Sequence, residues 1–131
     1  MADNKIIDGK QIAAAIKKEI ATEVAAMIDS GQSAPHLAAV IVGEDGPSLT
    51  YVASKEKACH SVGMMSSVYR LKENSTEEDV LNTIKFLNED PEIDGYIVQL
   101  PLPKHINETK IIQSICFLEK NNLKENIIIN A

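Results

Sequence analysis

The sequence of 131 residues contains no tryptophan, only 4% aromatic residues and only two cysteines. Cys59 and Cys116 lie far apart and neither belongs to a Cys-x-x-Cys pair, so the sequence offers neither a disulfide framework nor a zinc site. No apolar run approaches the roughly 20 residues that cross a bilayer, and the first residues lack the apolar segment of a signal peptide. We therefore expect a cytoplasmic protein with no membrane partner and no metal.

An excess of basic residues is also absent, because 13 Lys and Arg residues stand against 19 Asp and Glu residues and give a net charge of -6. Nucleic-acid binding depends on a basic face that neutralises phosphates, so we expect no nucleic-acid partner. The sequence also lacks the Gly-x-Gly-x-x-Gly turn of dinucleotide sites, since its last glycine is Gly95. The remaining composition, 44% hydrophobic and 24% charged, is typical of one globular domain.

Two segments have the apolar spacing of amphipathic helices. The first begins at residue 11, after the candidate N-cap Asp8, and stops before Gly31. Its apolar residues recur every three or four positions and are Ile12, Ile16, Ile20, Val24, Met27 and Ile28. The second begins where Ser75 and Glu78 have the spacing of a capping box, and it ends near Asp90. We expect this helix to turn four residues inward: Val80, Leu81, Ile84 and Leu87.

Short apolar runs alternate with helical segments. Residues 37–42 form a continuous apolar run, as expected of a strand buried on both faces, and further strands are predicted at residues 66–71 and 95–100. Helices are also predicted at residues 48–60 and 107–116. Strands that alternate with helices pair in parallel through right-handed crossovers, so the sequence predicts a single α/β domain, a three-layer open parallel sheet with helices on both faces.

The first candidate site motif lies in the helix predicted at residues 48–60. Tyr51 and Lys55 are four residues apart and share one face of that helix, and Ser48 lies three residues before Tyr51 on the same stripe. Taken alone, this spacing more often marks a solvated helix edge than a site.

The second motif, Gln99-Leu100-Pro101-Leu102-Pro103, ends a predicted strand with a polar amide and two prolines. Gln99 alone would more often satisfy backbone groups. However, ligands bind at the carboxyl ends of parallel strands, and both motifs follow a strand there. We expect the Lys55 amine and the Gln99 amide to converge, with Tyr51 lining the same concavity as the two prolines, which limit the freedom of its wall.

The turn Gly43-Glu44-Asp45-Gly46 follows the first predicted strand. It lacks the Gly-Lys-Ser/Thr sequence that completes a phosphate loop, and its two acids would repel phosphate. We interpret it as a turn that positions the following helix.

These residues resemble the catalytic domain of the bifunctional methylenetetrahydrofolate dehydrogenase/methenyltetrahydrofolate cyclohydrolase family. The resemblance spans residues 7–116 and includes the opening Ile6-Ile7-Asp8-Gly9-Lys10 as well as the two site motifs, Val42-Gly43, Lys57-Ala58-Cys59 and Asp94-Gly95. It implies a folate substrate. Full-length relatives oxidise 5,10-methylenetetrahydrofolate with NAD or NADP, hydrolyse 5,10-methenyltetrahydrofolate to 10-formyltetrahydrofolate in one-carbon metabolism, and are commonly homodimeric.

The resemblance also implies roles for individual residues. Lys55, Gln99 and Tyr51 match the family's catalytic residues: Lys55 moves protons, Gln99 holds its amine, and Tyr51 packs along the folate ring system. An exposed lysine titrates at about 10.4, so we expect desolvation to lower the pKa of Lys55. The resemblance further implies substrate-binding roles for Ser48, Tyr51, Leu100, Pro101 and Pro103.

The family pattern stops after Cys116. Relatives continue with a proline and an acidic stretch ending in Asp-Gly, whose aspartate binds the pterin, whereas this chain reads Phe117-Leu118-Glu119-Lys120. We expect residues 1–116 to form the folate-enzyme domain. Residues 117–131, rich in Asn, Lys and Ile, are then an atypical tail from a frameshift or misassembled gene end, or else an extra edge strand.

The NAD(P)-binding Rossmann domain of the relatives is absent from this sequence. We therefore expect a truncated chain that binds neither NAD nor NADP and has no dehydrogenase activity alone. The alternative to a truncated enzyme is a non-catalytic protein, either a folate-binding remnant or an α/β interaction module.

Overall fold

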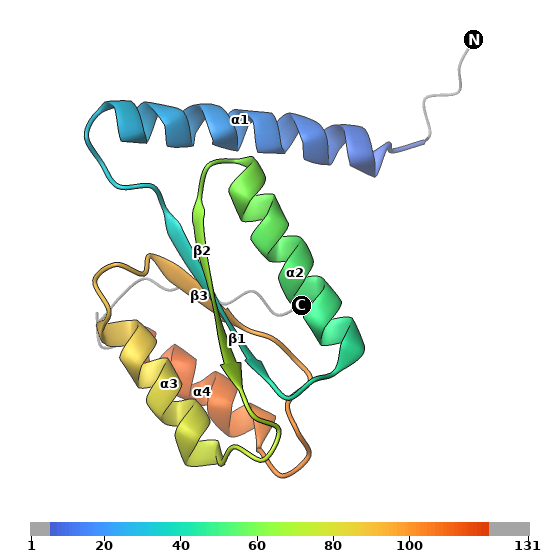
Figure 1. The fold of residues 1–131 in the computed structure, drawn as a ribbon, viewed down its shortest axis with the longest axis vertical. Helices are drawn as coiled ribbons and strands as arrows, with labels where there is room; N and C mark the ends of the chain where they lie inside the picture. The colour runs from blue at the N-terminus through green and yellow to red at the C-terminus, as the bar shows by residue number, and fades with distance from the viewer. Residues whose placement is uncertain (1–5, 121–131) are drawn as a thin grey trace.

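The computed structural model describes residues 6–120, and side chains within residues 6–115. Figure 1 shows helices and strands alternating along this part of the chain. The elements are α1 (Gly9–Asp29), β1 (His36–Val42), α2 (Gly46–Ser61), β2 (Met65–Leu71), α3 (Glu77–Glu89), β3 (Gly95–Val98) and α4 (Glu108–Lys120).

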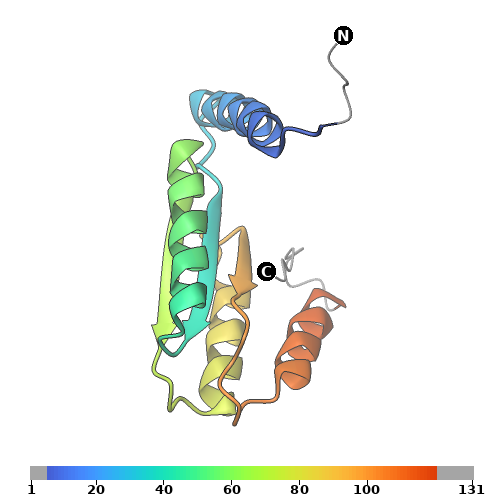
Figure 2. The same ribbon diagram turned by 90° about the vertical axis from the view of Figure 1, so that its right-hand side faces the viewer.

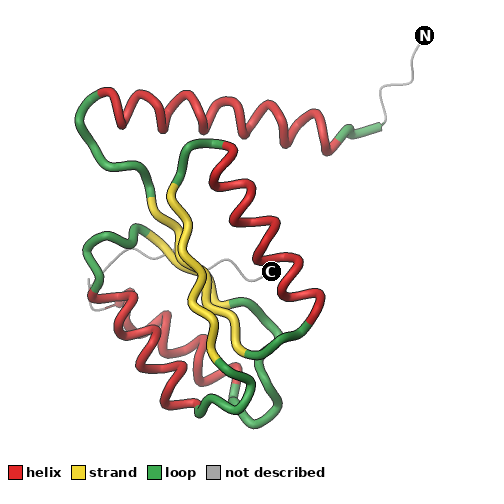
Figure 3. Tube along the Cα trace, viewed as in Figure 1, coloured by secondary structure: helices red, strands yellow, loops and turns green. Residues whose placement is uncertain are grey.

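The three strands, yellow in Figure 3, form one parallel sheet in the order β2-β1-β3. β1 is central because it pairs along both edges: Val40 pairs with Tyr69 of β2 on one side and with Val98 of β3 on the other. Both faces of its apolar run are also buried. In Figure 1, α2 lies on one side of the sheet and α3 and α4 lie on the other. The predicted three-layer α/β fold is therefore confirmed.

Alternate residues of β1 contribute to two separate cores. Val40 and Val42 face a large cluster that also contains Ile84 and Ile111, on the side of α3 and α4. Ile41 faces a smaller cluster on the side of α2. Successive side chains of a strand point to opposite faces, so one apolar run fixes both helical layers to the sheet.

The predicted helix at residues 11–30 is α1, and Asp8 caps it by accepting a hydrogen bond of 3.1 Å from the Gln11 backbone N–H. Its apolar face is largely uncovered, however: Ile16 is 50% exposed, and Val24 is the buried residue of the helix. Figures 1 and 2 show α1 lying across one end of the layers. The C-terminal half of α1 contacts the rest of the domain, because Val24 lies against Gly63 in the turn between α2 and β2.

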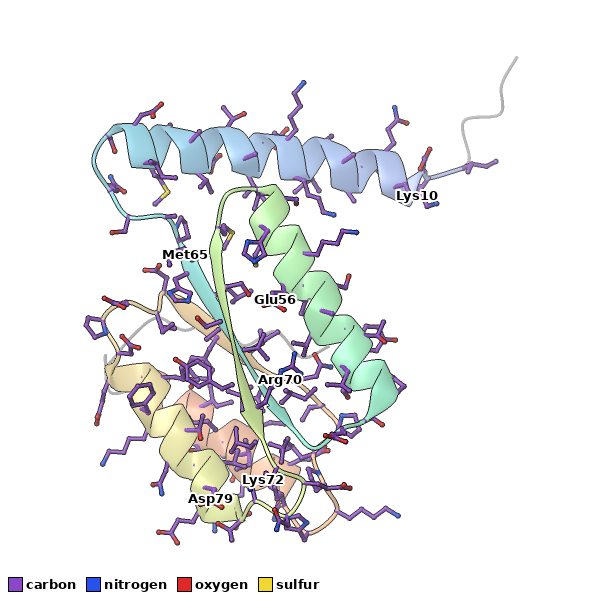
Figure 4. The ribbon with its side chains drawn as sticks, viewed as in Figure 1. Lys10, Glu56, Met65, Arg70, Lys72 and Asp79 are labelled. Carbon is purple, nitrogen blue, oxygen red and sulfur yellow. The ribbon has the colours of Figure 1, made fainter. Side chains whose placement is uncertain are left out.

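The predicted capping box of α3 is wrong by one residue. Thr76, and not Ser75, is the N-cap, and its side chain accepts a hydrogen bond of 3.1 Å from the Asp79 backbone N–H. The Asp79 carboxylate accepts one of 2.8 Å from the Thr76 backbone N–H in return. Figure 4 shows Asp79 in this first turn. The sequence permits both capping boxes, because Ser75 and Thr76 are consecutive and three acids follow them. The box that forms joins Thr76 to Asp79 and not Ser75 to Glu78.

Most element bounds differ from the prediction by one or two residues, and two C-terminal ends near the site differ by two or more. β3 ends at Val98 and not at residue 100, although the Gln99 N–H still donates to the Val40 carbonyl at 2.8 Å. α4 continues through Lys120, four residues past the predicted end, so the tail expected from residue 117 begins as helix. The rest of that tail, with its possible edge strand, lies outside the described residues. Within residues 6–120, no helix combines the length and apolar character needed to span a membrane.

Candidate functional site

The side chains of Lys55 and Gln99 meet beside α2. Lys55 projects from α2 and donates a hydrogen bond of 2.9 Å from Nζ to Oε1 of Gln99. Gln99 directly follows β3 and is 2% exposed, whereas Lys55 is half-buried. The predicted convergence of the two side chains is therefore confirmed.

The surroundings of Lys55 favour its neutral form. Burial removes part of the water that stabilises an ammonium group, so the pKa of Lys55 is lowered from its ordinary value of 10.5. Gln99 accepts the hydrogen bond without adding a negative charge, which would raise the pKa again. The Gln99 amide is held from its other side, because Nε2 donates to the Leu100 carbonyl at 3.0 Å. That contact directs Oε1, the acceptor, toward the amine.

Tyr51 lies on the outer side of α2 and not in the core. Its side chain is 57% exposed, and the Lys55 amine lies 6.0 Å from the centre of the ring. This distance is at the outer limit of a cation–π interaction. The ring therefore presents an apolar face next to the amine, open to a flat ligand.

Ser48 is more enclosed than its predicted role suggests. It is 2% exposed, and its hydroxyl donates a hydrogen bond of 2.8 Å to Oδ2 of Asp45. The same carboxylate oxygen accepts the Ser48 backbone N–H at 3.0 Å, which makes Asp45 the N-cap of α2. The site prediction does not include Asp45, although an Asp directly before a helix that has a proline in its first turn is a recognisable capping signal.

The loop after β3 contributes to a hollow of about 700 Å³ at the carboxyl ends of the strands. Pro101 and Pro103 line it, opposite Gly43 and Asp45 of the turn before α2. Leu100 is half-buried against the large core, and its peptide bond to Pro101 is cis. Neither Tyr51 nor Lys55 is among the residues lining this hollow, so it does not provide the single concavity that was predicted for Tyr51 and the prolines.

His105, next to the site loop, contacts the Ser75 carbonyl through Nε2 at 2.7 Å. Among the described residues, no three His, Cys, Asp or Glu side chains gather as ligands for a metal ion. Cys59 is buried, and this burial, with a smaller effect of the Glu56 charge, raises the pKa of its thiol.

The fold and the site together define a class of protein. It is a parallel α/β domain in which a lysine and a glutamine share a hydrogen bond at the carboxyl end of the sheet. The chain belongs to the tetrahydrofolate dehydrogenase/cyclohydrolase family, whose catalytic-domain model matches residues 7–120. The bifunctional protein FolD of Porphyromonas gingivalis is 53% identical over 111 residues, which are 85% of this chain and 38% of the relative.

Solved structures agree with this family membership. The bifunctional FolD enzyme of Campylobacter jejuni superposes with a TM-score of 0.79 at 42% identity, covering 82% of this chain and 38% of that one. The Trypanosoma brucei FolD, in complex with NADP cofactor and an inhibitor, has a TM-score of 0.79 at 34% identity over 88% of this chain and 39% of its own. This chain thus spans about 38% of the length of the curated relatives it matches.

Proposed function

We propose that this chain binds a reduced folate beside α2 and opens the methenyl bridge of 5,10-methenyltetrahydrofolate, as the folate half of a methylenetetrahydrofolate dehydrogenase/cyclohydrolase. The observation that carries the proposal is the hydrogen bond between Lys55 and Gln99. It places a desolvated amine against a neutral, oriented acceptor, which is the arrangement a proton-transfer group needs near neutral pH.

The proposed reaction begins when the oxygen of a water molecule bonds to the electrophilic methenyl carbon. The neutral amine of Lys55 takes a proton from that water, giving a neutral carbinol intermediate. The carbinol then loses its hydroxyl proton as the C=O bond forms and the bond from carbon to N5 breaks, and N5 takes a proton. The product is 10-formyltetrahydrofolate, and one proton is released overall, so a single group that accepts and returns protons suffices.

Other residues would hold the substrate. Tyr51 offers an exposed aromatic face beside the amine, on which the flat rings of a folate would stack. Leu100, Pro101 and Pro103 form the loop that follows Gln99 and would provide the wall of the site. Ser48, also assigned to substrate binding, would support the site without touching the folate, since it is buried and its hydroxyl already donates to Asp45.

A dinucleotide cofactor does not fit the described residues. The turn before α2 is the best candidate for a phosphate, but Asp45 occupies the end of that helix and accepts its free backbone N–H. A carboxylate there competes with phosphate for the same donors and repels it. The NADP site of the Trypanosoma brucei relative belongs to a chain much longer than this one. We therefore assign hydride transfer to full-length relatives and derive no step through the cofactor here.

We propose that the folate domain, expected to end at residue 116, extends to the end of α4. The helix and the family match, which both reach Lys120, support this extension. With this boundary, the domain would contain Lys55, Gln99 and Tyr51. The pterin-binding aspartate of the relatives would have no counterpart in it.

A titration followed by an activity assay tests the proposal. We expect 5,10-methenyltetrahydrofolate to release heat on binding to the purified chain and to be hydrolysed, with both effects lost in Lys55→Met. Lys57→Met is the matched control, because Lys57 is an exposed lysine two residues away on α2. Binding without hydrolysis would indicate a non-catalytic folate-binding remnant, and neither effect would indicate an interaction module.

A further inference from the structure

A continuous series of contacts leads from the start of α2 to the Lys55 amine. Oδ2 of Asp45 accepts the Ser48 hydroxyl at 2.8 Å, and the Ser48 oxygen lies 3.4 Å from the Leu100 carbonyl oxygen. The same carbonyl accepts Nε2 of Gln99 at 3.0 Å, and Oε1 of Gln99 accepts the Lys55 amine. Ser48 and Gln99 are each 2% exposed, so the middle of this series is shielded from water, whereas Asp45 at its start is exposed.

The Ser48 hydroxyl has one proton and two neighbouring acceptors. Asp45 is both nearer and charged, and a charge-assisted hydrogen bond is the stronger of the two. The proton is therefore given to Asp45, which leaves the Leu100 carbonyl to the Gln99 amide. Without the carboxylate, Ser48 would turn its proton toward the Leu100 carbonyl, which can accept two hydrogen bonds and would then be shared between Ser48 and the Gln99 amide.

The Gln99 amide depends on this carbonyl for its orientation. Sharing that carbonyl with Ser48 would weaken the Nε2 contact and shift the amide, and with it the Oε1 acceptor that Lys55 uses. Asp45 also fixes α2 at its first turn, and Lys55 lies on the same helix. Loss of the Asp45 carboxylate would therefore disturb the Lys55–Gln99 pair from both sides, through the Gln99 amide and through α2.

We propose that Asp45 is a positioning residue for the Lys55–Gln99 pair, acting through Ser48 and the Leu100 carbonyl. Asp45 itself does not touch the amine. The consequence for folate binding rests on the proposed function, whereas the consequence for the two side chains does not.

The test compares Asp45→Ala, Asp45→Asn and Asp45→Gly with Thr76→Ala. Asparagine keeps an acceptor for Ser48. Glycine is well tolerated at an N-cap but has no side chain, so Asp45→Gly separates positioning from helix stability. Thr76→Ala removes the equivalent cap from α3, which lies in the other helical layer. Nuclear magnetic resonance of the full chain would follow the Gln99 side-chain amide and the titration of Lys55.

We expect the Gln99 amide resonances and the Lys55 titration midpoint to move in Asp45→Ala and Asp45→Gly, and to stay near wild type in Asp45→Asn and Thr76→Ala. The rate at which 5,10-methenyltetrahydrofolate is hydrolysed should fall roughly tenfold or more in the first two variants, since small misplacements of a reacting group slow the reaction. Unchanged Gln99 and Lys55 signals in Asp45→Gly would overturn the proposal. If wild type binds no folate, the proposed function fails, and the resonance comparison still decides the role of Asp45.

Discussion

Lys55 and Gln99 share a hydrogen bond of 2.9 Å although 44 positions separate them in the sequence. The contact exists because α2 packs on one face of the sheet against β1 and β2, and β3 pairs with β1 in the same sheet. Parallel pairing brings the end of β3 to the side of the sheet at which α2 begins. The pair is therefore a product of the topology and not of local sequence.

Replacing Gln99 with glutamate should raise the pKa of Lys55. In wild type, burial lowers this pKa below 10.5, so the unfolded chain holds the proton more tightly and the contribution of Lys55 to the free energy of unfolding rises as pH increases toward that value. A carboxylate in hydrogen-bond contact stabilises the ammonium form and reverses the shift. Cyclohydrolase activity should fall accordingly, because less neutral amine is available.

The measurement is the pH titration of the Lys55 side chain by nuclear magnetic resonance, with exposed Lys57 as an internal reference. Gln99→Met is the control variant, since it removes the acceptor without adding charge. A Lys55 midpoint in Gln99→Glu at or below the wild-type value would contradict this account of the pair.

The two candidate caps of α3 can be distinguished by alanine substitution. Thr76→Ala should lower the free energy of unfolding by about 1 kcal/mol, because it leaves the Asp79 backbone N–H without its acceptor. Ser75→Ala should change it by less than about 0.5 kcal/mol, as is usual for positions outside such features. Urea denaturation of the two variants is sufficient, and a larger loss from Ser75→Ala would restore the capping box first predicted.

Two isoleucines of similar chemistry should differ in their contribution to stability. Ile84 of α3 is fully buried in the large core, so Ile84→Ala should cost about 2–5 kcal/mol. Ile16 of α1 is 50% exposed, so Ile16→Ala should cost less than about 1 kcal/mol in this chain. Equal losses in chemical denaturation would mean that the apolar face of α1 is covered in solution.

The order of helices and strands was predictable because periodicity and caps are local. The period of α1 correctly indicated a helix, but it showed only which face can be buried, and Ile16 has no covering layer among the described residues. The pairing of Lys55 with Gln99 was predicted from the two motifs and the parallel sheet. The hydrogen bond from Ser48 to Asp45 was not predicted. The Ser48 hydroxyl has two neighbouring acceptors, and only the assembled fold defines which of them is nearer.

The central claim is that a folate binds beside α2 through the Lys55–Gln99 pair. Calorimetric titration of 5,10-methenyltetrahydrofolate into wild type, Lys55→Met and Lys57→Met tests it most directly. We expect saturable binding to wild type and to Lys57→Met, and at least about a tenfold loss of affinity, equal to about 1.4 kcal/mol, in Lys55→Met. Equal binding by all three proteins, or binding by none, would contradict the claim.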